Sequence, residues 1–409
     1  MTTATQKLAT GYKQTEIGMI PEDWDVKRLD EVFSISAGRD LVKDSYSPIR
    51  NNDHPFPIYS NSLENGGLYG FAKIARHKKN SITITARGSI GKANTRKYDF
   101  DAIGRLLVLE PIKELNCFFI SEYLNNRVSF SIESTGVPQL TAPQASQYSI
   151  AFPNPTEQTA IADALSDVDF LTEKLKRLIE KKKNIRLGAM QELLTGKRRM
   201  PGFTDEWIEK PLTEVAWFQE GPGVRTSQFT ERGIKLLNGT NIYRGKLLLE
   251  NTSRFISESE AFGPYSHFLA EVGDIVIASS GITIDKFDEK IAFVKKEHLP
   301  LCMNTSTIRF KVKGSALDAN FLYYFLMSKK FKDQIGAQAT GSAQLNFGPF
   351  HLERAEIYLP KDKAEQTAIA DVLSAMDSEI EKLESQLMKY QNIKQGMMQT
   401  LLTGKIRLK

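Results

Sequence analysis

The sequence contains few of the residues that build disulfide frameworks or metal sites. Only two cysteines, Cys117 and Cys302, and five histidines occur among its 409 residues. The cysteines stand far apart and outside any C-x-x-C pair, so they predict buried free thiols rather than a disulfide framework or a zinc site. The histidines are scattered without H-E-x-x-H spacing, and we expect no metal site.

Long apolar stretches are also missing. No run of 18 apolar residues exists, and residues 1–10 lack the apolar core of a signal peptide. We therefore expect a cytoplasmic protein. With 41% hydrophobic and 25% charged residues, the composition is that of globular material with room for two or three domains.

Motifs of nucleotide binding and methyl transfer are missing as well. The Gly-Lys pairs at residues 196–197 and 404–405 are neither followed by Ser or Thr nor preceded by the first glycine of a P-loop, so ATP binding is not supported. Residues 154–157 resemble an adenine-methyltransferase N-P-P-Y loop but lack its second proline and its aromatic residue, and we interpret them as the entry to a helix. A Gly-Asp…Asp-x-Lys string with Asp274, Asp288 and Lys290 is only faintly nuclease-like, because such triplets are common by chance.

What the sequence does contain is a long internal repeat. Residues 157–197 align without a gap with residues 365–405, at an offset of 208 residues, and are identical at 24 of 41 positions. Both copies begin E-Q-T-A-I-A-D and end L-L-T-G-K. The stretches before the two copies are largely dissimilar, whereas a solenoid would repeat every roughly 20 to 50 residues throughout. One design is therefore used twice, with constant helices alternating with variable domains.

Both copies have the composition of long helices. They are rich in strong helix formers, lack internal proline and stop at Gly-Lys. Each should run for about 39 residues, or roughly 58 Å. Apolar residues recur in them with the 4-3 spacing of a coiled-coil seam. The predicted seam residues are Ile161, Leu165, Val168, Leu175 and Ile179 in the first copy and Ile369, Leu373, Met376, Ile380, Leu383 and Leu387 in the second.

Basic residues interrupt this seam. Lys182 and Arg186 occupy seam positions in the first copy, and Lys394 occupies one in the second. The two helices could pair within the chain or provide seams for a homodimer. We favour an antiparallel intramolecular pair, because each helix follows its own globular domain and such a pair would place the domains at opposite ends of a rod.

The positive charge is concentrated in the first copy. The whole chain has a net charge of +5, whereas residues 171–199 alone hold ten basic and three acidic residues, a local charge of +7. Such a stripe is either a solvated helix face or a surface that passes close to phosphates. The sequence leaves both interpretations open.

The two variable stretches share their entry and exit signals. The entry strings, residues 24–32 and 207–215, have a Trp and a Val at the same spacing. The closing strings, residues 135–140 and 340–345, share the pattern T-G-x-x-Q-L. Between them, short apolar runs bounded by Gly, Asn and Asp predict strands, and aromatic-rich stretches predict helices. We therefore predict a mixed α/β domain that is built twice.

Polar, glycine-rich loops occur in both variable domains. Arg, Asn, Gln and Ser side chains read base edges in the major groove, and small residues bring backbone amides close to phosphates. One such loop is more often a plain turn, but its occurrence in both domains favours DNA binding. The candidate DNA-binding residues are Arg39, Lys43, Ser60, Asn61, Arg87, Ser89, Lys92 and Gln139 in the first domain and Arg225, Ser227, Asn238, Asn241, Ser279, Ser280, Gln344 and Asn346 in the second.

Taken together, the duplicated E-Q-T-A-I-A-D…L-L-T-G-K helices, the G-Y-K-Q-T-E-I-G-M-I-P-E-D-W opening and the two divergent domains resemble the specificity subunit of type I restriction-modification enzymes. The resemblance runs from about Gly11 to the C-terminus. It implies an α+β protein in which two long antiparallel coiled-coil helices separate two mixed α/β target recognition domains, with pseudo-twofold symmetry. The expected boundaries are residues 1–155 and 200–363 for the recognition domains, the first with an N-terminal segment, and residues 156–199 and 364–409 for the helices.

The resemblance also implies a function. Each recognition domain would read one half of a bipartite, asymmetric site in double-stranded DNA, while the helix pair would set the spacer length and dock two modification (methyltransferase) subunits. S-adenosylmethionine, ATP and magnesium would be bound by the modification and restriction (endonuclease/translocase) subunits, and this chain would be non-catalytic. One alternative is a stand-alone sequence-specific DNA-binding regulator, against which stand the two unlike readers and the lack of a helix-turn-helix signature. Another is a nuclease or methyltransferase in its own right, against which stand the missing motifs.

Overall fold

The two repeat copies form the two long helices of the protein. In the computed structural model, helix α4 spans Pro155–Leu193 and helix α10 spans Lys363–Leu401. Each has 39 residues, the length that the sequence predicted. The start of α4 confirms that residues 154–157 are a helix entry, because the Asn154 side chain accepts a hydrogen bond from the Glu157 N–H at 2.9 Å and Pro155 occupies the first helical position.

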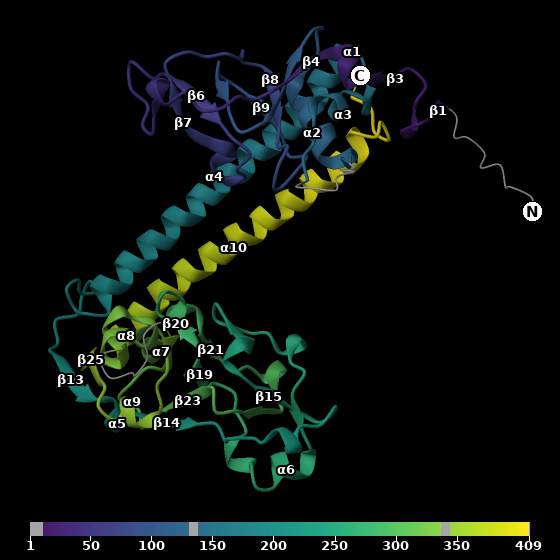
Figure 1. Ribbon diagram of the computed structural model, residues 1–409. Helices are drawn as coiled ribbons and strands as arrows, with labels where there is room; N and C mark the ends of the chain where they lie inside the picture. Colours follow the sequence, from purple (N-terminus) through teal and green to yellow (C-terminus); the bar gives the residue numbers. More distant parts are fainter. Residues whose placement is uncertain (1–10, 131–137, 337–343, 409) are drawn as a thin grey trace, which may run out of the picture. The chain divides into compact units, whose positions relative to one another are not determined.

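The chain divides into two units. Unit 1 combines residues 1–176 with residues 385–409, and unit 2 comprises residues 177–384. Each unit therefore contains one variable domain, one part of α4 and one part of α10 (Figure 1). The structure describes residues 11–130, 138–336 and 344–408. The first residues of both T-G-x-x-Q-L strings lie outside the described residues.

The variable domain of unit 1 consists of short strands and helices. Its strands are β1 (Tyr12–Thr15), β2 (Gly18–Pro21), β3 (Asp25–Arg28), β4 (Phe33–Ala37), β5 (Tyr46–Ser47), β6 (Phe56–Tyr59), β7 (Leu68–Ala72), β8 (Ser81–Ile84), β9 (Ala93–Arg96), β10 (Asp101–Ala102), β11 (Leu107–Pro111) and β12 (Ser149–Phe152). Its helices are α1 (Leu29–Val32), α2 (Cys117–Arg127) and α3 (Ala142–Ser146). One sheet has the antiparallel order β4-β11-β8-β9, and another has the order β10-β6-β7-β5 with β10 parallel to β6.

The core of unit 1 includes both long helices. Strand β8, with the sequence Ser-Ile-Thr-Ile, is buried at every position because it lies in the middle of its sheet, and α2 packs against β8 and β9. The same hydrophobic cluster contains Ile161 and Leu165 of α4, Leu401 of α10 and Leu402 directly after it. The helix ends are therefore part of the domain core.

Unit 2 has the same kinds of elements. Its strands are β13 (Trp207–Pro211), β14 (Ala216–Glu220), β15 (Ile234–Leu237), β16 (Ile242–Tyr243), β17 (Lys246–Leu247), β18 (Phe255–Ile256), β19 (Ile275–Ala278), β20 (Ile282–Thr283), β21 (Ile291–Phe293), β22 (Leu301–Met303), β23 (Thr307–Val312), β24 (Gln344–Leu345) and β25 (Glu356–Pro360). Its helices are α5 (Leu212–Val215), α6 (Glu258–Phe262), α7 (Ala319–Met327), α8 (Lys329–Gly336) and α9 (Pro349–Leu352).

The topology of unit 2 repeats that of unit 1. The order β14-β23-β19-β21 matches β4-β11-β8-β9, and β22 runs parallel to β15 as β10 runs parallel to β6. The antiparallel pair β13 and β25 matches the pair β3 and β12, which joins the start of each domain to its end. The duplication therefore covers whole halves of the chain, although the variable sequences have diverged.

The α4 and α10 segments run antiparallel within each unit. Asp169 lies beside Lys394 in unit 1, and Lys182 and Arg186 lie beside Glu379 and Asp377 in unit 2. The predicted seam residues are buried or half-buried here: Ile161, Leu165, Val168, Leu175, Ile179, Ile369, Leu373, Met376, Ile380, Leu383 and Leu387. The helices thus pair within the chain, as the sequence favoured.

In unit 1 the start of α4 is held by a group of three side chains, which we name the first clasp. The buried Glu157 carboxylate accepts a hydrogen bond from Trp24 Nε1 at 3.0 Å and two from the Arg407 guanidinium at 2.6 and 2.7 Å. Arg407 also binds Asp23 at 2.7 and 2.8 Å. Its hydrogen bonds to Glu157 and Asp23 raise the pKa of Arg407 above its usual value. Arg407 belongs to the tail after α10, so that tail closes the start of α4.

Unit 2 contains an equivalent second clasp at the start of α10. The Glu365 carboxylate accepts hydrogen bonds from Trp207 Nε1 at 3.3 Å and from Arg199 at 2.7 and 2.7 Å. Arg199 also donates to the Asp205 carbonyl at 2.7 Å. Because Arg199 follows α4, the tail of each long helix closes the start of the other one.

Candidate nucleic-acid interface

The loops at the strand ends of unit 1 form a connected polar edge, which we name the first rim. The Arg39 N–H donates to the Ala102 carbonyl, and the Gly104 N–H donates to the Arg39 carbonyl, both at 3.0 Å. Asn61 then links this turn to the loop after β8, because its Nδ2 donates to the Gly104 carbonyl at 2.6 Å and its Oδ1 accepts from the Ala86 N–H at 2.7 Å. Three strand-end loops thus meet at Asn61.

Arg87 and Gln139 extend the first rim. The Arg87 guanidinium donates from Nε at 2.9 Å and from Nη2 at 2.6 Å to Gln139 Oε1, and the two residues also form a β-bridge. This contact uses two of the five guanidinium N–H donors. Arg87 is exposed and is held in one orientation, a state suited to reading a guanine edge.

Arg105 is a rim residue that the sequence analysis missed. It is exposed, with a left-handed φ of 68°, and its N–H donates to the Gly38 carbonyl at 3.2 Å. Gly38 itself passes so close to the Ala102 backbone that a Cβ atom would lie 2.8 Å from it. The signal in the sequence was the Gly104-Arg105 pair directly before a buried strand, but such a pair also suits a plain turn.

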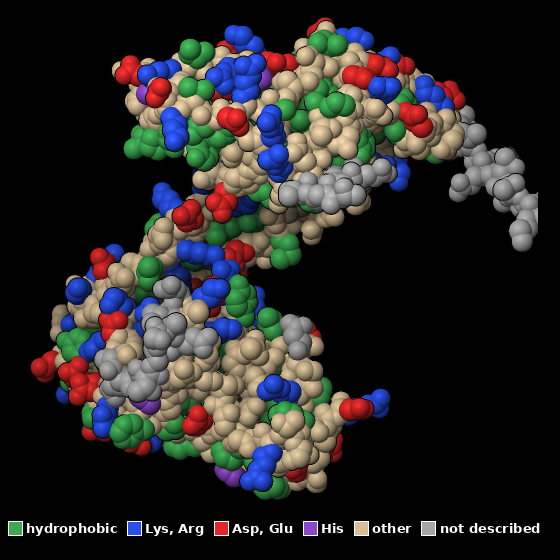
Figure 2. Space-filling view, in the orientation of Figure 1, with side chains coloured by type: hydrophobic (Ala, Val, Ile, Leu, Met, Phe, Trp, Pro, Cys, Tyr) green, Lys and Arg blue, Asp and Glu red, His purple; other side chains and the backbone are tan. Residues whose placement is uncertain are grey.

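The other candidates in the first domain lie beside or away from the first rim. Ser60 is half-buried, and its N–H donates to the Gly67 carbonyl at 2.8 Å. Ser89 and Lys92 are exposed in the loop after β8, beside Arg87. Lys43 lies in a different turn, whose Ser45 carbonyl accepts from Lys73 in the β5–β7 region. Figure 2 shows Lys and Arg side chains interspersed with acidic ones on the visible face of this unit.

Equivalent loops of unit 2 form a second rim. The Asn304 Nδ2 donates to Asn238 Oδ1 at 2.9 Å, and the Ser306 hydroxyl accepts from the Gly239 N–H at 3.1 Å. The Ser306 carbonyl accepts from the Ser279 N–H at 2.9 Å. These loops follow β15, β19 and β22, which correspond to β6, β8 and β10 of unit 1. Asn304 and Ser306 were not singled out from the sequence, where N-T-S-T reads as a turn between two apolar strands.

Asn346 and Gly221 complete the second rim. Asn346 is exposed, and its Oδ1 accepts from the Gly281 N–H at 2.8 Å, beside the exposed Ser280. A Cβ atom on Gly221 would lie 2.4 Å from the Asn304 carbonyl oxygen, a close approach equivalent to that of Gly38 in unit 1. Gln344 lies in β24, which pairs with β20.

The roles predicted for Asn241 and Ser279 require a correction. Asn241 is 5% exposed, and its side chain accepts from the Asn238 N–H at 3.0 Å and donates to the Leu248 carbonyl at 3.3 Å. Ser279 is 1% exposed, and its hydroxyl donates to the Thr305 carbonyl at 3.3 Å. Buried polar side chains need such internal partners. We therefore assign both residues to shaping the second rim rather than to contacting bases.

Arg225 and Ser227 lie in the loop after β14 and are exposed. The Gln228 side chain anchors this loop, because its Oε1 accepts from the Arg225 N–H at 2.9 Å and its Nε2 donates to Glu260 at 2.7 Å. The loop begins at Gly221, which contacts the second rim, so its exposed side chains extend from that rim toward α6.

The faint nuclease-like string does not assemble into a site. Asp274 is buried and accepts a hydrogen bond from Arg309 at 3.3 Å, whereas the Lys290 ammonium donates to the Ile242 carbonyl at 2.8 Å. Asp288 is exposed. In the described parts of the chain, no group of three or more His, Cys, Asp or Glu residues is placed to hold a metal ion, and no helix is long and apolar enough to span a membrane.

Much of the basic stripe of α4 is neutralised within unit 2. Lys182 pairs with Glu379 at 2.7 Å, Lys183 with Glu384 at 2.5 Å, and Arg186 with Asp377. Arg199 binds Glu365 in the second clasp, so four of the ten basic residues pair with carboxylates of α10 rather than with a phosphate backbone. Lys174, Lys176 and Lys181 are exposed.

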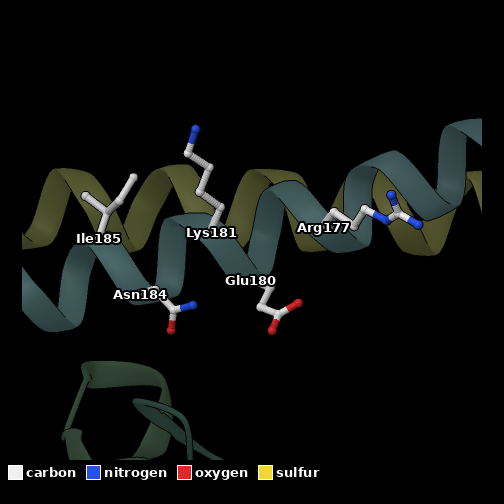
Figure 3. Close-up of a pocket in the computed structure, with 5 residues that line it drawn as sticks. All are labelled: Arg177, Glu180, Lys181, Asn184 and Ile185. Atoms are coloured by element: carbon white, nitrogen blue, oxygen red, sulfur yellow. The ribbon is translucent and has the colours of Figure 1, made fainter. Parts of the chain in front are cut away.

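A shallow hollow lies along α4 within unit 2 (Figure 3). Its lining residues are Arg177, Glu180, Lys181, Asn184 and Ile185. All five belong to a single helix and are exposed, so the hollow is an open surface depression rather than an enclosed cofactor site.

Two equivalent α/β domains, each with a polar rim and a clasped helix, define a protein in which one design is built twice. A protein-family model described as the type I restriction modification DNA specificity domain matches residues 21–182 and again residues 204–389. The chain therefore belongs to the type I restriction modification DNA specificity family. This membership confirms the identification made from the sequence and does not support a stand-alone regulator.

Sequence and structure comparisons with individual proteins agree with this assignment. The chain is 27% identical to the type I restriction enzyme MjaVIII specificity subunit of Methanocaldococcus jannaschii, over 97% of this chain and 96% of that protein. Among solved structures, the S subunit of a type I restriction-modification system from M. genitalium matches with a TM-score of 0.61 at 18% identity, over 97% of this chain and 98% of that one. A chain from work on complex assembly and conformational transition of the type I R-M system matches with a TM-score of 0.55 at 15% identity, over 95% and 99% of the two chains. The structural matches show that the fold is shared.

Proposed function

We propose that the first rim and the second rim each read one half of a bipartite DNA site. The observation that carries this proposal is that the rims occupy equivalent strand ends but present different side chains. The first rim presents arginines, Arg39, Arg87 and Arg105, whereas the second presents small polar residues, Ser280 and Asn346. Two unlike readers on one chain suit an asymmetric site, because a symmetric dimer would require a palindrome.

The long helices would set the number of unread base pairs between the two half-sites. Helix α4 continues without interruption from unit 1 into unit 2 and has 39 residues, which corresponds to roughly 58 Å. Two contacts on the same face of B-DNA that are one helical turn apart are separated by about 34 Å. A continuous helix of this length is sufficient to link two readers that are one turn apart.

The methyltransferase and nuclease chemistry would belong to partner subunits. Type I systems combine a specificity subunit with modification and restriction subunits, and we propose that this chain directs two modification subunits to DNA. S-adenosylmethionine, ATP and magnesium would then be bound by those partners. A docking face is available on α4 in unit 2, where Leu178, Ile185 and Leu187 are 39%, 47% and 51% exposed beside the hollow at Lys181.

The test is a domain exchange in the complex with the modification subunits. Residues 212–360, from α5 to β25, would be replaced by the equivalent residues of a relative, which leaves both clasps and both helices unchanged. We expect adenine methylation sites in the genome to change in one half and keep the other half and the spacer. A matched exchange of residues 29–152 should change the opposite half. A change of both half-sites in either exchange would contradict separate readers.

A further inference from the structure

The basic residues that interrupt the helix seam occupy equivalent places in the two units. Arg186 and Lys394 are separated by the repeat offset of 208 residues, and so are their partners Asp169 and Asp377. In each unit, the basic residue of one long helix faces the aspartate of the other long helix. A third polar residue, contributed by the variable domain, joins each pair.

In unit 1 the third residue is Glu122 of α2. The Lys394 ammonium lies 2.8 Å from Asp169 Oδ2 and 3.3 Å from Glu122 Oε2. The Lys394 and Glu122 side chains are only 20% and 14% exposed. Burial acts to lower the pKa of Lys394, but Asp169 and Glu122 outweigh it and the pKa is raised. We name Lys394, Asp169 and Glu122 the first trio.

In unit 2 the third residue is Tyr324 of α7, which corresponds to α2. Its hydroxyl donates to Asp377 Oδ2 at 2.8 Å, and Arg186 Nη2 donates to the same oxygen at 3.3 Å. Arg186 is 13% exposed, and its guanidinium lies 6.0 Å from the Tyr324 ring centre. Burial and the neighbouring Asp377 raise the pKa of Tyr324, which favours the protonated hydroxyl that donates to Asp377. We name Arg186, Asp377 and Tyr324 the second trio.

A trio of this kind contributes little to stability but fixes the register of one long helix along the other. Removing charges from water costs free energy that an ion pair regains only in part, so apolar replacements of a buried pair are often neutral or stabilising. An apolar seam, in contrast, tolerates sliding of one helix along the other, because leucine packs against leucine after every heptad, about 10.5 Å along the axis. One polar residue at a seam position opposes such sliding, because the slide would leave its charge buried and unpaired.

The trios also link the helix register to the variable domain. Glu122 lies on α2, which packs against β8 and β9, and Tyr324 lies on α7, which packs against β21 and β23. Strands β8 and β23 adjoin loops of the first and second rim. A shift of α10 along α4 in unit 1 would move Lys394 away from Glu122 as well as from Asp169. The rim of each unit is therefore held at one position along its helix pair.

We propose that the first trio and the second trio are sets of positioning residues that fix how each recognition domain sits on the helix pair, and thereby the spacer length that the protein accepts. This inference rests on the proposed function, in which the rims read the two half-sites. The second trio contains one carboxylate and a tyrosine where the first contains two carboxylates, so the first trio holds the more charge-dependent of the two registers.

The experiment measures spacer selectivity in the complex with the modification subunits. A library of DNA sites keeps both half-sites and varies the spacer by up to two base pairs in each direction, and methylation is read by sequencing. The main variant is the neutral triple substitution Lys394→Met, Asp169→Asn and Glu122→Gln, which preserves side-chain size and removes every charge of the first trio. Lys389→Met, at an exposed lysine of α10, is the matched control.

We expect the triple variant to keep the parental melting temperature within a few degrees and the parental half-site sequences. Its preference for the parental spacer over spacers one base pair longer or shorter should fall by roughly tenfold, a change typical of coupled charged groups. The single variant Lys394→Met leaves two carboxylates facing each other, so it should lower the melting temperature and relax the spacer as well. Lys389→Met should match the parent in both measurements.

A folded triple variant with the parental spacer preference would overturn the proposal, since the first trio would then serve packing alone. Altered half-site sequences with an unchanged spacer would overturn it too. If the triple variant fails to fold, Tyr324→Phe, which deletes only one hydroxyl of the second trio, decides the matter through the same spacer ratio. Failure of the proposed function is distinguishable, because it would show in the parental complex as methylation without any bipartite site.

Discussion

Replacing Arg407 by alanine should destabilise unit 1 at the start of α4, although Arg407 follows α10 and is distant from α4 in the sequence. In the first clasp, the Glu157 side chain is 1% exposed and receives two of its three side-chain hydrogen bonds from Arg407. The variant Arg407→Ala leaves this carboxylate buried with only Trp24 Nε1 as a side-chain donor.

The expected loss follows from the burial of the pair. Removing one partner of a buried ion pair costs about 3–5 kcal/mol. Arg407 is 20% exposed and the hydrogen bond from Trp24 to Glu157 persists, so a loss of about 2–4 kcal/mol in the free energy of unfolding of unit 1 is expected. Since about 1.4 kcal/mol corresponds to a factor of ten, amide exchange along residues 155–176 should accelerate by roughly 30-fold to several hundredfold.

Hydrogen exchange followed by mass spectrometry measures this change, because it separates peptides of unit 1 from those of unit 2. Peptides of α7 in unit 2 provide the internal reference and should keep their rates. Lys405→Ala, at an exposed residue of the same tail, is the matched control and should change the exchange by less than about twofold. The reasoning would be refuted if Arg407→Ala behaved like Lys405→Ala, or if both units accelerated equally.

Three further predictions concern the two rims and the thiols. Asn241→Ala should lower the free energy of unfolding of unit 2 by about 1–3 kcal/mol and leave the recognised sequence unchanged. Arg87→Ala should leave unit 1 folded and weaken discrimination at one base pair by about 1–3 kcal/mol. Urea unfolding measures the stability of each variant and methylation of single-base site variants measures its discrimination, and the reverse pattern would contradict our assignment. Burial raises the pKa of both Cys117 and Cys302 from 9.0 to about 12, so the thiols should resist alkylation at pH 8 until urea is added. Because the folded state disfavours the thiolate, the contribution of the two thiols to stability is complete below about pH 9 and is lost as the pH rises toward 12. Rapid alkylation of the folded chain at pH 8 would contradict the burial of the thiols.

The sequence predicted the helices and the duplication because their signals are local. Helix formers, the seam spacing and the offset of 208 residues can be read without knowing what the helices contact. Burial of the two cysteines and strands at short apolar runs, such as β8 and β23, were predicted for the same reason.

The rims could be predicted only in part, because they are assembled from loops that are distant in the sequence. Asn61 and Arg87 were chosen for their side-chain chemistry and do lie together, but the same chemistry suggested Asn241 and Ser279, whose polar atoms are used inside the domain. Residue type does not tell whether an amide caps a turn or reaches solvent. The trios were visible only as defects in the seam, since their partners come from the other helix and from α2 or α7.

Unit 1 is built from two separate segments of the chain, which has a consequence for folding during synthesis. Unit 2 is one continuous segment, residues 177–384, whereas unit 1 needs residues 385–408 to complete the core around Ile161 and to supply Arg407. At roughly 5–20 residues per second, a ribosome needs on the order of 10 to 50 seconds to pass from residue 176 to the end. During that interval the apolar face of α4 near Ile161 lacks its partner, so the first domain to be translated is the last one to be completed.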